Sequence, residues 1–460
     1  MSNPKGSWSI LSVWVTVVIL AATIYSSGYW NDKGRVIASD VIDYYGYLPA
    51  TFIFKDLGVD KAETIEGGTF YTFRLPNGNN IFKMSMGMAL AYLPFFVAGH
   101  FGAHFFDYPV DGFSEPYRLA LLLGGLLYFS MGMLFLRKIL KRTFPEKISA
   151  LTLIAVGLGT NLFYYASDEG TMSHVYSFAL ITVFLWHTIR WHENPSALRL
   201  LFIGILAGWI TLIRPSNIII LLIFLLYGVW SWATLRDKII SYFRKFDWFM
   251  LMFGGFLLPW VPQFLYNIYF TDQLLFYSYN DEGFFFNNPQ IIDGLFSYRK
   301  GWLIYTPLMA FAIAGLPVLF RKHKELAWPL AIYTSVNMFI IFSWWCWWYG
   351  GSYGQRPMID SYGLMAIPMA YMFQWALSGH KWKIAGLTII IFLLVGLNQF
   401  QIRKYRKGSI HFADMTGKAY WHSFMSVRPR SGFYDLLETP DYSKAKQGIY
   451  EVLPKEDPSD

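Results

Sequence analysis

Two carboxylates stand among tyrosines in the stretch SDVIDYYGYLPA, residues 39–50, shortly after the first apolar run of the chain. If this stretch is helical, Asp40, Asp43 and Tyr44 fall on one face, because residues three and four apart are neighbours on a helix. Carboxylates can remove a proton from a hydroxyl group or bind the hydroxyls of a sugar. The same stretch also fits a short interfacial helix capped by Ser39 or Asp40 and flanked by an aromatic belt. The residues of this stretch leave both interpretations open.

Three cations stand at the ends of apolar runs. Arg214 interrupts ITLIRPSNIII, Lys300 precedes an apolar run in FSYRKGWLIYTP, and Arg356 follows a glycine pair in WWYGGSYGQRP. A charge beside an apolar run lies within or close to the membrane, where it is costly, and it commonly marks a transport pathway or an anion-binding site. A phosphate is an anion that such cations bind. Snorkelling of Arg214 to the interface and contact of Lys300 with headgroups would account for the same residues.

Aromatic and polar side chains accompany these charges. The stretch WWCWWYGGSYGQRPMID, residues 344–360, surrounds a glycine pair with tryptophans and tyrosines, and exposed indole faces suit sugar rings or polyprenyl chains. An aromatic belt with a tight turn is the simpler alternative. His174 opens an apolar run in SDEGTMSHVYSF, where a hydrogen-bonded helix end is the alternative to a ligand contact. The residues that we expect to bind substrate are Tyr44, His174, Trp348, Tyr353 and Asp360.

The composition places all these groups in a membrane protein. Of the 460 residues, 55% are hydrophobic and only 15% are charged, whereas a soluble domain carries roughly a quarter charged residues. The net charge of +8 is accounted for by basic cytoplasmic loops, so nucleic acid is not expected as a partner. The single cysteine, Cys346, excludes an internal disulfide and a multi-cysteine metal site.

About eleven apolar stretches reach the roughly 20 residues that cross a bilayer. They are 8–27, 117–136, 148–166, 174–189, 199–213, 216–234, 248–270, 301–320, 326–345, 359–377 and 384–400. Their linkers alternate between basic ones, expected in the cytoplasm, and ones poor in Lys and Arg, expected outside. The first stretch could be a signal peptide, but it is long for one and lacks an A-x-A-like site, so we expect it to be retained. The fold class expected is an all-α polytopic membrane protein.

One further segment decides on which side Asp40 lies. Residues 84–106 are long and uncharged enough to cross the membrane. If they cross, the amino terminus is outside and Asp40 is cytoplasmic. If they lie in the interface or re-enter, the amino terminus is inside and Asp40 faces outward. Three glycines, Pro94 and two histidines in this segment favour the second arrangement.

At these motifs the chain resembles the integral-membrane glycosyltransferases of the GT-C superfamily, which includes protein O-mannosyltransferases and the aminoarabinose transferase of lipid A. SDVIDYYGYLPA is similar to the acidic motif that follows the first span of that family. IFKMSMGMALAYLPFF resembles its juxtamembrane segment, and GWITLIRPS, SYRKGWLIYTP and WWYGGSYGQRP resemble three further stretches of bacterial members. The similarity is a pattern over most of residues 8–400, and WWYGGSYGQRP is its most specific part.

The resemblance implies a cytoplasmic amino terminus, an extracytoplasmic carboxyl terminus and a bacterial inner membrane. Residues 1–400 would form a transmembrane catalytic domain whose first outer loop, 28–116, contains interfacial helices, and residues 401–460 an outer cap. Asp40 best matches the motif acid that serves as base, and Asp43 is the other candidate. The Asp-Glu pair of many members is absent from this motif. Metal dependence varies across the superfamily, so a divalent metal is possible but not implied.

The function expected is transfer of a monosaccharide from a polyprenyl-phosphate donor to a hydroxyl acceptor, by a single inverting displacement on the outer face. Glycans, lipids and proteins all offer such a hydroxyl. Asp40 would act as base, and Arg214, Lys300 and Arg356 would hold the donor phosphate. The alternative is a transporter or flippase of a lipid-linked sugar, which predicts broken helices near the midplane and an internal repeat. A structural scaffold would leave the outward cations without a role.

Overall fold

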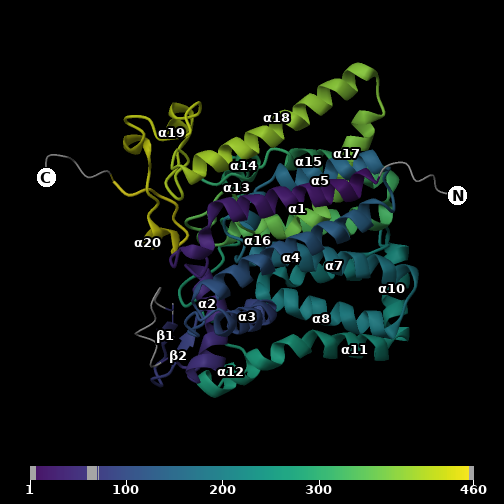
Figure 1. The fold of residues 1–460 in the computed structure, drawn as a ribbon. Helices are drawn as coiled ribbons and strands as arrows, with labels where there is room; N and C mark the ends of the chain where they lie inside the picture. Colours follow the sequence, from purple (N-terminus) through teal and green to yellow (C-terminus); the bar gives the residue numbers. More distant parts are fainter. Residues whose placement is uncertain (1–6, 60–69, 71, 455–460) are drawn as a thin grey trace.

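The fold is a bundle of long helices that lie side by side, with smaller elements gathered at one end (Figure 1). This computed structural model describes residues 7–59, 70 and 72–454. Within those residues, the two named strands are β1 (Thr72–Arg74) and β2 (Asn80–Phe82), which pair antiparallel. The all-α class predicted from the sequence is therefore confirmed.

Six helical segments of the described residues are long and apolar enough to cross a membrane. They are Trp8–Asn31, Gly87–Phe105, Glu115–Leu140, Phe246–Thr271, Lys324–Ser343 and Lys381–Arg406. They correspond to α1 (Trp8–Ser27) with the 3-10 turn η1 (Tyr29–Asn31), α3 (Gly87–Phe105), α4 (Glu115–Leu140), α11 (Phe246–Leu257) with η5 (Leu258–Trp260) and α12 (Val261–Thr271), α16 (Lys324–Ser343) and α18 (Lys381–Arg406). These helices, together with the overall composition, identify an integral membrane protein.

The other expected spans are also helical; apart from α7 (Ser173–Glu193), which is continuous over 21 residues, they are shorter or interrupted. They comprise α5 (Glu146–Leu158) and α6 (Leu162–Ser167), α7, α8 (Ala197–Ile213), η4 (Pro215–Ile220) and α9 (Leu221–Leu226), α14 (Trp302–Tyr305) and α15 (Met309–Lys322), and η6 (Arg356–Ser361) and α17 (Tyr362–Leu377). Pro215 and Pro307 stand at two of the interruptions, because proline has no N–H to continue a helical ladder.

The expected span 216–234 ends early. Its helix stops at Leu226, and Gly228 then takes a positive φ of 81° that turns the chain. A separate amphipathic helix, α10 (Trp232–Arg244), follows at the other end of the bundle from the hairpin (Figure 1). The sequence suggested a plain basic linker there, but its residues alternate apolar and charged side chains at helical spacing.

Glycines allow the long helices to approach closely. A Cβ atom at Gly204 or Gly208 of α8 would lie 2.1 or 2.0 Å from a backbone carbonyl oxygen of α11, and one at Gly315 of α15 would lie 1.9 Å from that of Pro368 on α17. Small residues commonly let helices pack in this way in membranes, where lipid supplies no hydrophobic drive for association. These contacts fix the frame from which the site residues project.

Both ends of α3 contact the same end of the bundle. Near its start, a Cβ at Gly87 would clash with the backbone of Ile213, the last residue of α8. Twelve residues later, Gly99 lies against Tyr117, in the first turn of α4. The helix α2 (Asp40–Pro49), the π-turn η2 (Ala50–Phe54) and the β1–β2 hairpin lie at this end as well (Figure 1).

The chain after α18 packs on that same end. It contains α19 (Gly417–His422), η7 (Tyr434–Leu436) and α20 (Tyr442–Ala445). Arg406, in the last turn of α18, forms an ion pair of 2.5 Å with Asp168, in the connection between α6 and α7. The small elements at both ends of the sequence therefore meet at one end of the bundle.

The positions of Gly78 and Lys141 allow a test of topology. Gly78 lies in the turn of the β1–β2 hairpin, and Lys141 follows α4 at the opposite end of that helix from Tyr117. We expect a reporter inserted at Gly78 to be extracytoplasmic and one at Lys141 to be cytoplasmic, because basic linkers stay inside. Paired alkaline phosphatase and fluorescent-protein fusions measure this. Cytoplasmic location of Gly78 would contradict the arrangement.

Candidate functional site

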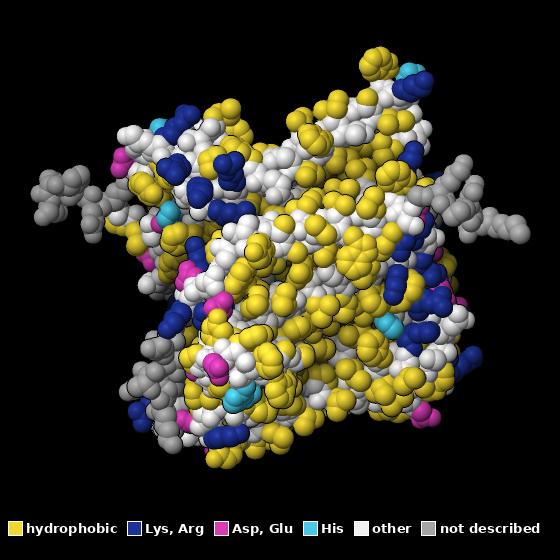
Figure 2. Space-filling view, viewed as in Figure 1, with side chains coloured by type: hydrophobic (Ala, Val, Ile, Leu, Met, Phe, Trp, Pro, Cys, Tyr) yellow, Lys and Arg dark blue, Asp and Glu magenta, His cyan; other side chains and the backbone are white. Residues whose placement is uncertain are grey.

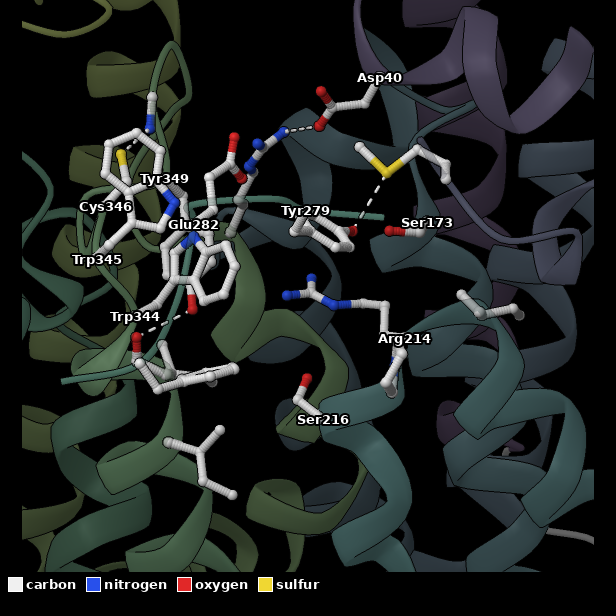
Figure 3. Close-up of a pocket in the computed structure, with 18 of the residues that line it drawn as sticks. Asp40, Ser173, Arg214, Ser216, Tyr279, Glu282, Trp344, Trp345, Cys346 and Tyr349 are labelled. Carbon is white, nitrogen blue, oxygen red and sulfur yellow. Dashed lines mark hydrogen bonds and ion pairs between the residues drawn. The ribbon is translucent and has the colours of Figure 1, made fainter. Parts of the chain in front are cut away.

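A cavity of about 570 Å³ opens at the end of the bundle that carries α2 and the hairpin (Figure 3). Its walls come from α2, the start of α7, η4, the loop before α13 (Ile291–Phe296), the end of α16 and the turn before η6. Five residues singled out in the sequence line it: Asp40, Tyr44, His174, Arg214 and Arg356. The fold thus brings together side chains that are more than 300 positions apart in the chain.

Asp40 and Arg356 form the central ion pair of the cavity. Arg356 Nη1 lies 3.2 Å from Asp40 Oδ2, and their side chains are 17% and 33% exposed (Figure 3). Burial lowers the pKa of Arg356, but the negative charges of Asp40 and Glu169 help to raise it above its ordinary value. Arg356 therefore stays charged, and both groups of the pair line the cavity.

Backbone strain lies beside this pair. Ser39, at the N-cap of α2, has a φ of 51° and makes no side-chain capping hydrogen bond. Tyr349, on the cavity wall, has a φ of 56°. A non-glycine residue with positive φ is uncommon, and such residues cluster at functional sites. The sequence suggested that a serine or aspartate side chain caps α2, but the Ser39 backbone instead turns Asp40 toward the cavity.

Arg214 is held by a buried polar network below the cavity. Its Nη1 lies 3.0 Å from His174 Nδ1, and its Nε lies 3.7 Å from Asp360 Oδ2. Asp360 is 1% exposed; its carboxylate contacts His174 Nδ1 at 3.1 Å and accepts a hydrogen bond of 2.9 Å from Asn217. Because Asp360 and His174 hold two of its nitrogen atoms, they orient Arg214, whose guanidinium lines the cavity (Figure 3).

Asp43 occupies a different environment from Asp40. It is 1% exposed and is not among the residues that line the cavity. Burial, Tyr266 and the charge of Asp43 together raise the pKa of Tyr47, one turn along α2. Of the two carboxylates, only Asp40 presents its oxygen atoms to the cavity.

Five predicted site residues lie outside the cavity wall: Asp43 and Asp360, described above, and Lys300, Trp348 and Tyr353. Lys300 is 1% exposed, and its ammonium group donates hydrogen bonds to the backbone oxygens of Ser352 and of Phe412, the latter at 2.5 Å. Trp348 donates from its indole N–H to Tyr442, and Tyr353 lies among other tyrosine rings. Burial, followed by the charge of Arg356, lowers the pKa of Lys300 to about 7. These positions favour a structural role for Lys300, Trp348 and Tyr353.

The cavity wall also contains Lys83, Met84, Tyr279 and Glu282, which the sequence did not predict as site residues. Lys83 pairs with Glu282 at 2.6 Å, and Tyr279 donates to Met84 Sδ at 3.3 Å. These contacts join the first loop to the 271–290 loop across the cavity. Lys83 stands in IFKMSMG, a stretch that the sequence did single out, but no local signal links it to Glu282.

The remaining wall of the cavity is apolar. It contains Ile218, Ile219, Phe284, Phe286, Ile340 and Ile341. Ile218 is 47% exposed and Phe286 is 52% exposed, so this wall reaches the surface of the bundle. The cavity therefore joins a charged floor to an apolar flank. Among the residues that the structure describes, no group of three or more His, Cys, Asp or Glu side chains is arranged to hold a metal ion.

Comparison with known proteins finds similarity at the level of structure. No family model matches the sequence, and no curated protein matches it. The fold is similar to that of an oligosaccharyltransferase of Archaeoglobus fulgidus in its apo form, with a TM-score of 0.47 and 10% sequence identity. The similarity covers 98% of this chain and 57% of the archaeal one, so this chain spans little more than half the length of that protein.

The Lys300 contacts predict a stability effect. Lys300→Met would leave the carbonyl oxygens of Ser352 and Phe412 without their buried donor, at a cost of about 1–3 kcal/mol. We expect a lower melting temperature of the detergent-solubilised protein. Lys418→Met, at an exposed position, is the matched control. Unchanged thermal stability of Lys300→Met would contradict the structural role.

Proposed function

We propose that this protein is a membrane glycosyltransferase of the GT-C type that transfers a monosaccharide from a polyprenyl-phosphate donor to a hydroxyl acceptor. One observation supports it above the others. A carboxylate and two guanidinium groups, from Asp40, Arg214 and Arg356, share a cavity whose other wall is apolar and reaches the surface. A donor with an anionic phosphate between a sugar and a hydrocarbon chain matches each part of this cavity.

In the proposed reaction, Asp40 accepts the proton of the acceptor hydroxyl as its oxygen atom attacks the anomeric carbon of the sugar. The bond between that carbon and the phosphate oxygen breaks, and the phosphate keeps the electron pair. Arg214 and Arg356 stabilise the negative charge that builds up on the departing phosphate. Because the displacement is single, the configuration at the anomeric carbon inverts.

The ion pair between Asp40 and Arg356 gives the reaction an order. Without donor, the guanidinium of Arg356 lies 3.2 Å from the carboxylate of Asp40 and occupies it. A phosphate that binds Arg356 competes for the guanidinium and leaves the carboxylate of Asp40 available to the acceptor. In this order, Asp40 accepts the proton of the acceptor hydroxyl only after the donor has bound.

The proposed topology follows from the contacts of α3. Since Gly87 and Gly99 both contact the end of the bundle that carries Asp40, we propose that α3 lies in the interface and does not cross the membrane. The amino terminus is then cytoplasmic, and the cavity and the segment after α18 are extracytoplasmic, in a bacterial inner membrane. Residues 1–400 form the catalytic domain and residues 401–460 its cap.

A transporter or flippase of a lipid-linked sugar is the competing function. Such a protein needs polar groups along a path through the bilayer. The charged residues of the cavity lie instead at one end of the bundle, where Asp40 pairs with Arg356 and Arg214 contacts His174 and Asp360. This arrangement favours chemistry at the surface over passage through the membrane.

The Asp40 assignment predicts a selective loss of activity. Asp40→Asn keeps the size of the side chain but cannot accept a proton, so we expect transfer to fall roughly 10²–10⁴-fold, with expression and melting temperature close to those of the parent. Asp43→Asn, one turn away and outside the cavity, is the matched control and should lose much less activity. The measurement is sugar transfer by purified protein from a defined polyprenyl-phosphate sugar. Transfer by Asp40→Asn at the parental rate would exclude Asp40 as the base.

The arginines predict a loss of donor use. Arg214→Ala and Arg356→Ala each remove one charge-assisted contact to phosphate, worth about 1.5–3 kcal/mol, so we expect kcat/KM for donor to fall roughly ten- to a hundredfold. Arg321→Ala, exposed at the far end of α15, is the control. Isothermal titration with polyprenyl phosphate separates binding from chemistry. Parental affinity and turnover in both cavity variants would exclude a phosphate site.

A further inference from the structure

A second cluster of cations lies on the cap, away from the walls of the cavity. The C-terminal turn of α18 presents Arg403 and Lys407 to solvent, and the segment after α19 presents Arg428 and Arg430. Two exposed apolar side chains accompany them, Trp421 at 59% and Met425 at 79% exposure. We name this set the cap patch: Arg403, Lys407, Trp421, Met425, Arg428 and Arg430.

The two halves of the cap patch are held together by buried contacts. Lys404, a buried residue of the same turn of α18, donates hydrogen bonds of 2.8 and 2.9 Å to the backbone oxygens of Ser423 and Phe424. Ser409 donates from its hydroxyl to the backbone oxygens of Ser426 and Val427. These contacts fasten the segment 421–430 to the end of α18. The four cations therefore lie on two segments that are held against each other.

The cap patch keeps its positive charge. Arg406, between its α18 members, is neutralised by Asp168 at 2.5 Å. Among the described residues, no ion pair joins Arg403, Lys407, Arg428 or Arg430 to a carboxylate. Figure 2 shows Lys and Arg side chains gathered on the cap as well as at the opposite end of the bundle, with a broad apolar belt between them. The positive-inside rule accounts for one of these two gatherings but not both.

The position of the cap patch relative to the membrane indicates its partner. It begins in the last turn of α18, a helix that is apolar enough to span the bilayer and whose Ile389, Phe392 and Leu393 are exposed. Its cations therefore lie at headgroup level, with an indole and a thioether beside them. Tryptophan prefers this level of a membrane, and clustered Lys and Arg attract anionic lipids.

We propose that the cap patch is a binding site for the phosphate headgroup of an anionic phospholipid in the adjacent leaflet. Arg403, Lys407, Arg428 and Arg430 would contact the phosphate, and Trp421 and Met425 would insert beside the acyl chains. The site would hold the cap against the bilayer through Lys404 and Ser409, the residues that join it to α18. This inference is independent of the proposed transferase reaction.

A local quenching experiment tests this proposal. A fluorophore on Met425→Cys in the full chain, reconstituted in nanodiscs, reports nitroxide-headgroup lipids that approach the cap patch; Cys346 is buried, so the parent chain gives the background labelling. We expect nitroxide phosphatidylglycerol to quench at least about fivefold more strongly than nitroxide phosphatidylcholine, the preference that one interfacial cation gives. Phe105→Cys on α3, 80% exposed and without neighbouring Lys or Arg in AHFFDYPVD, should show no preference.

Charge variants and a soluble competitor separate the possible outcomes. Arg428→Gln with Arg430→Gln should lower the preference at Met425→Cys severalfold, and Arg428→Lys with Arg430→Lys should retain it. Equal quenching by both lipids in the parent patch would overturn the proposal. Loss of the preference on addition of glycerol phosphate at a concentration well below that of the lipid headgroups would also overturn it, since the site would then select a free phosphate. Sugar transfer measured on the same samples reports the transferase separately.

Discussion

A charge inside a membrane protein must be paired, and the arrangement of this fold follows from where its charges are paired. Arg356 balances Asp40, and Arg214 rests on Asp360, at one end of a bundle whose flanks are apolar. Asp360 is almost fully buried, and Asn217 and His174 also contact it, as a buried polar group requires. The turn η6 is thereby tied to α2 through Arg356, and through Asp360 to α7, to η4 and to Arg214, the extended residue between α8 and η4. Packing sets the frame, and the ion pairs select which helix ends meet.

Much of this arrangement follows from local patterns in the sequence. The apolar runs predicted the long helices, because a bilayer demands about 20 apolar residues of each crossing segment. Arg214 and Arg356 were singled out because a cation between apolar runs is costly unless an anion or the interface stabilises it, and both line the cavity. Asp40 was found as an acid in an aromatic stretch. In each case the signal is a residue type that the surrounding hydrophobicity makes costly.

The features that were missed depend on contacts that no local pattern encodes. Lys300 carries the same signal as Arg356, yet its ammonium group is satisfied by the carbonyl oxygens of Ser352 and Phe412, which lie 52 and 112 positions further along the chain. The pairing of Lys83 with Glu282 spans 199 positions. Tryptophan signals were similarly ambiguous: Trp344 and Trp345 line the cavity, whereas Trp348 lies against Tyr442 of α20. Neighbouring indoles thus serve different purposes for reasons of tertiary packing.

The apolar flank of the cavity determines which ligand concentration controls the occupancy of the cavity. Ile218 and Phe286 are half exposed at the bundle surface, so a ligand with a hydrocarbon chain can approach along the plane of the bilayer and need not pass through water. Its search is two-dimensional, and occupancy of the cavity depends on its mole fraction among the lipids. Dilution of the aqueous phase would leave that occupancy unchanged, whereas addition of inert lipid at constant protein would lower it.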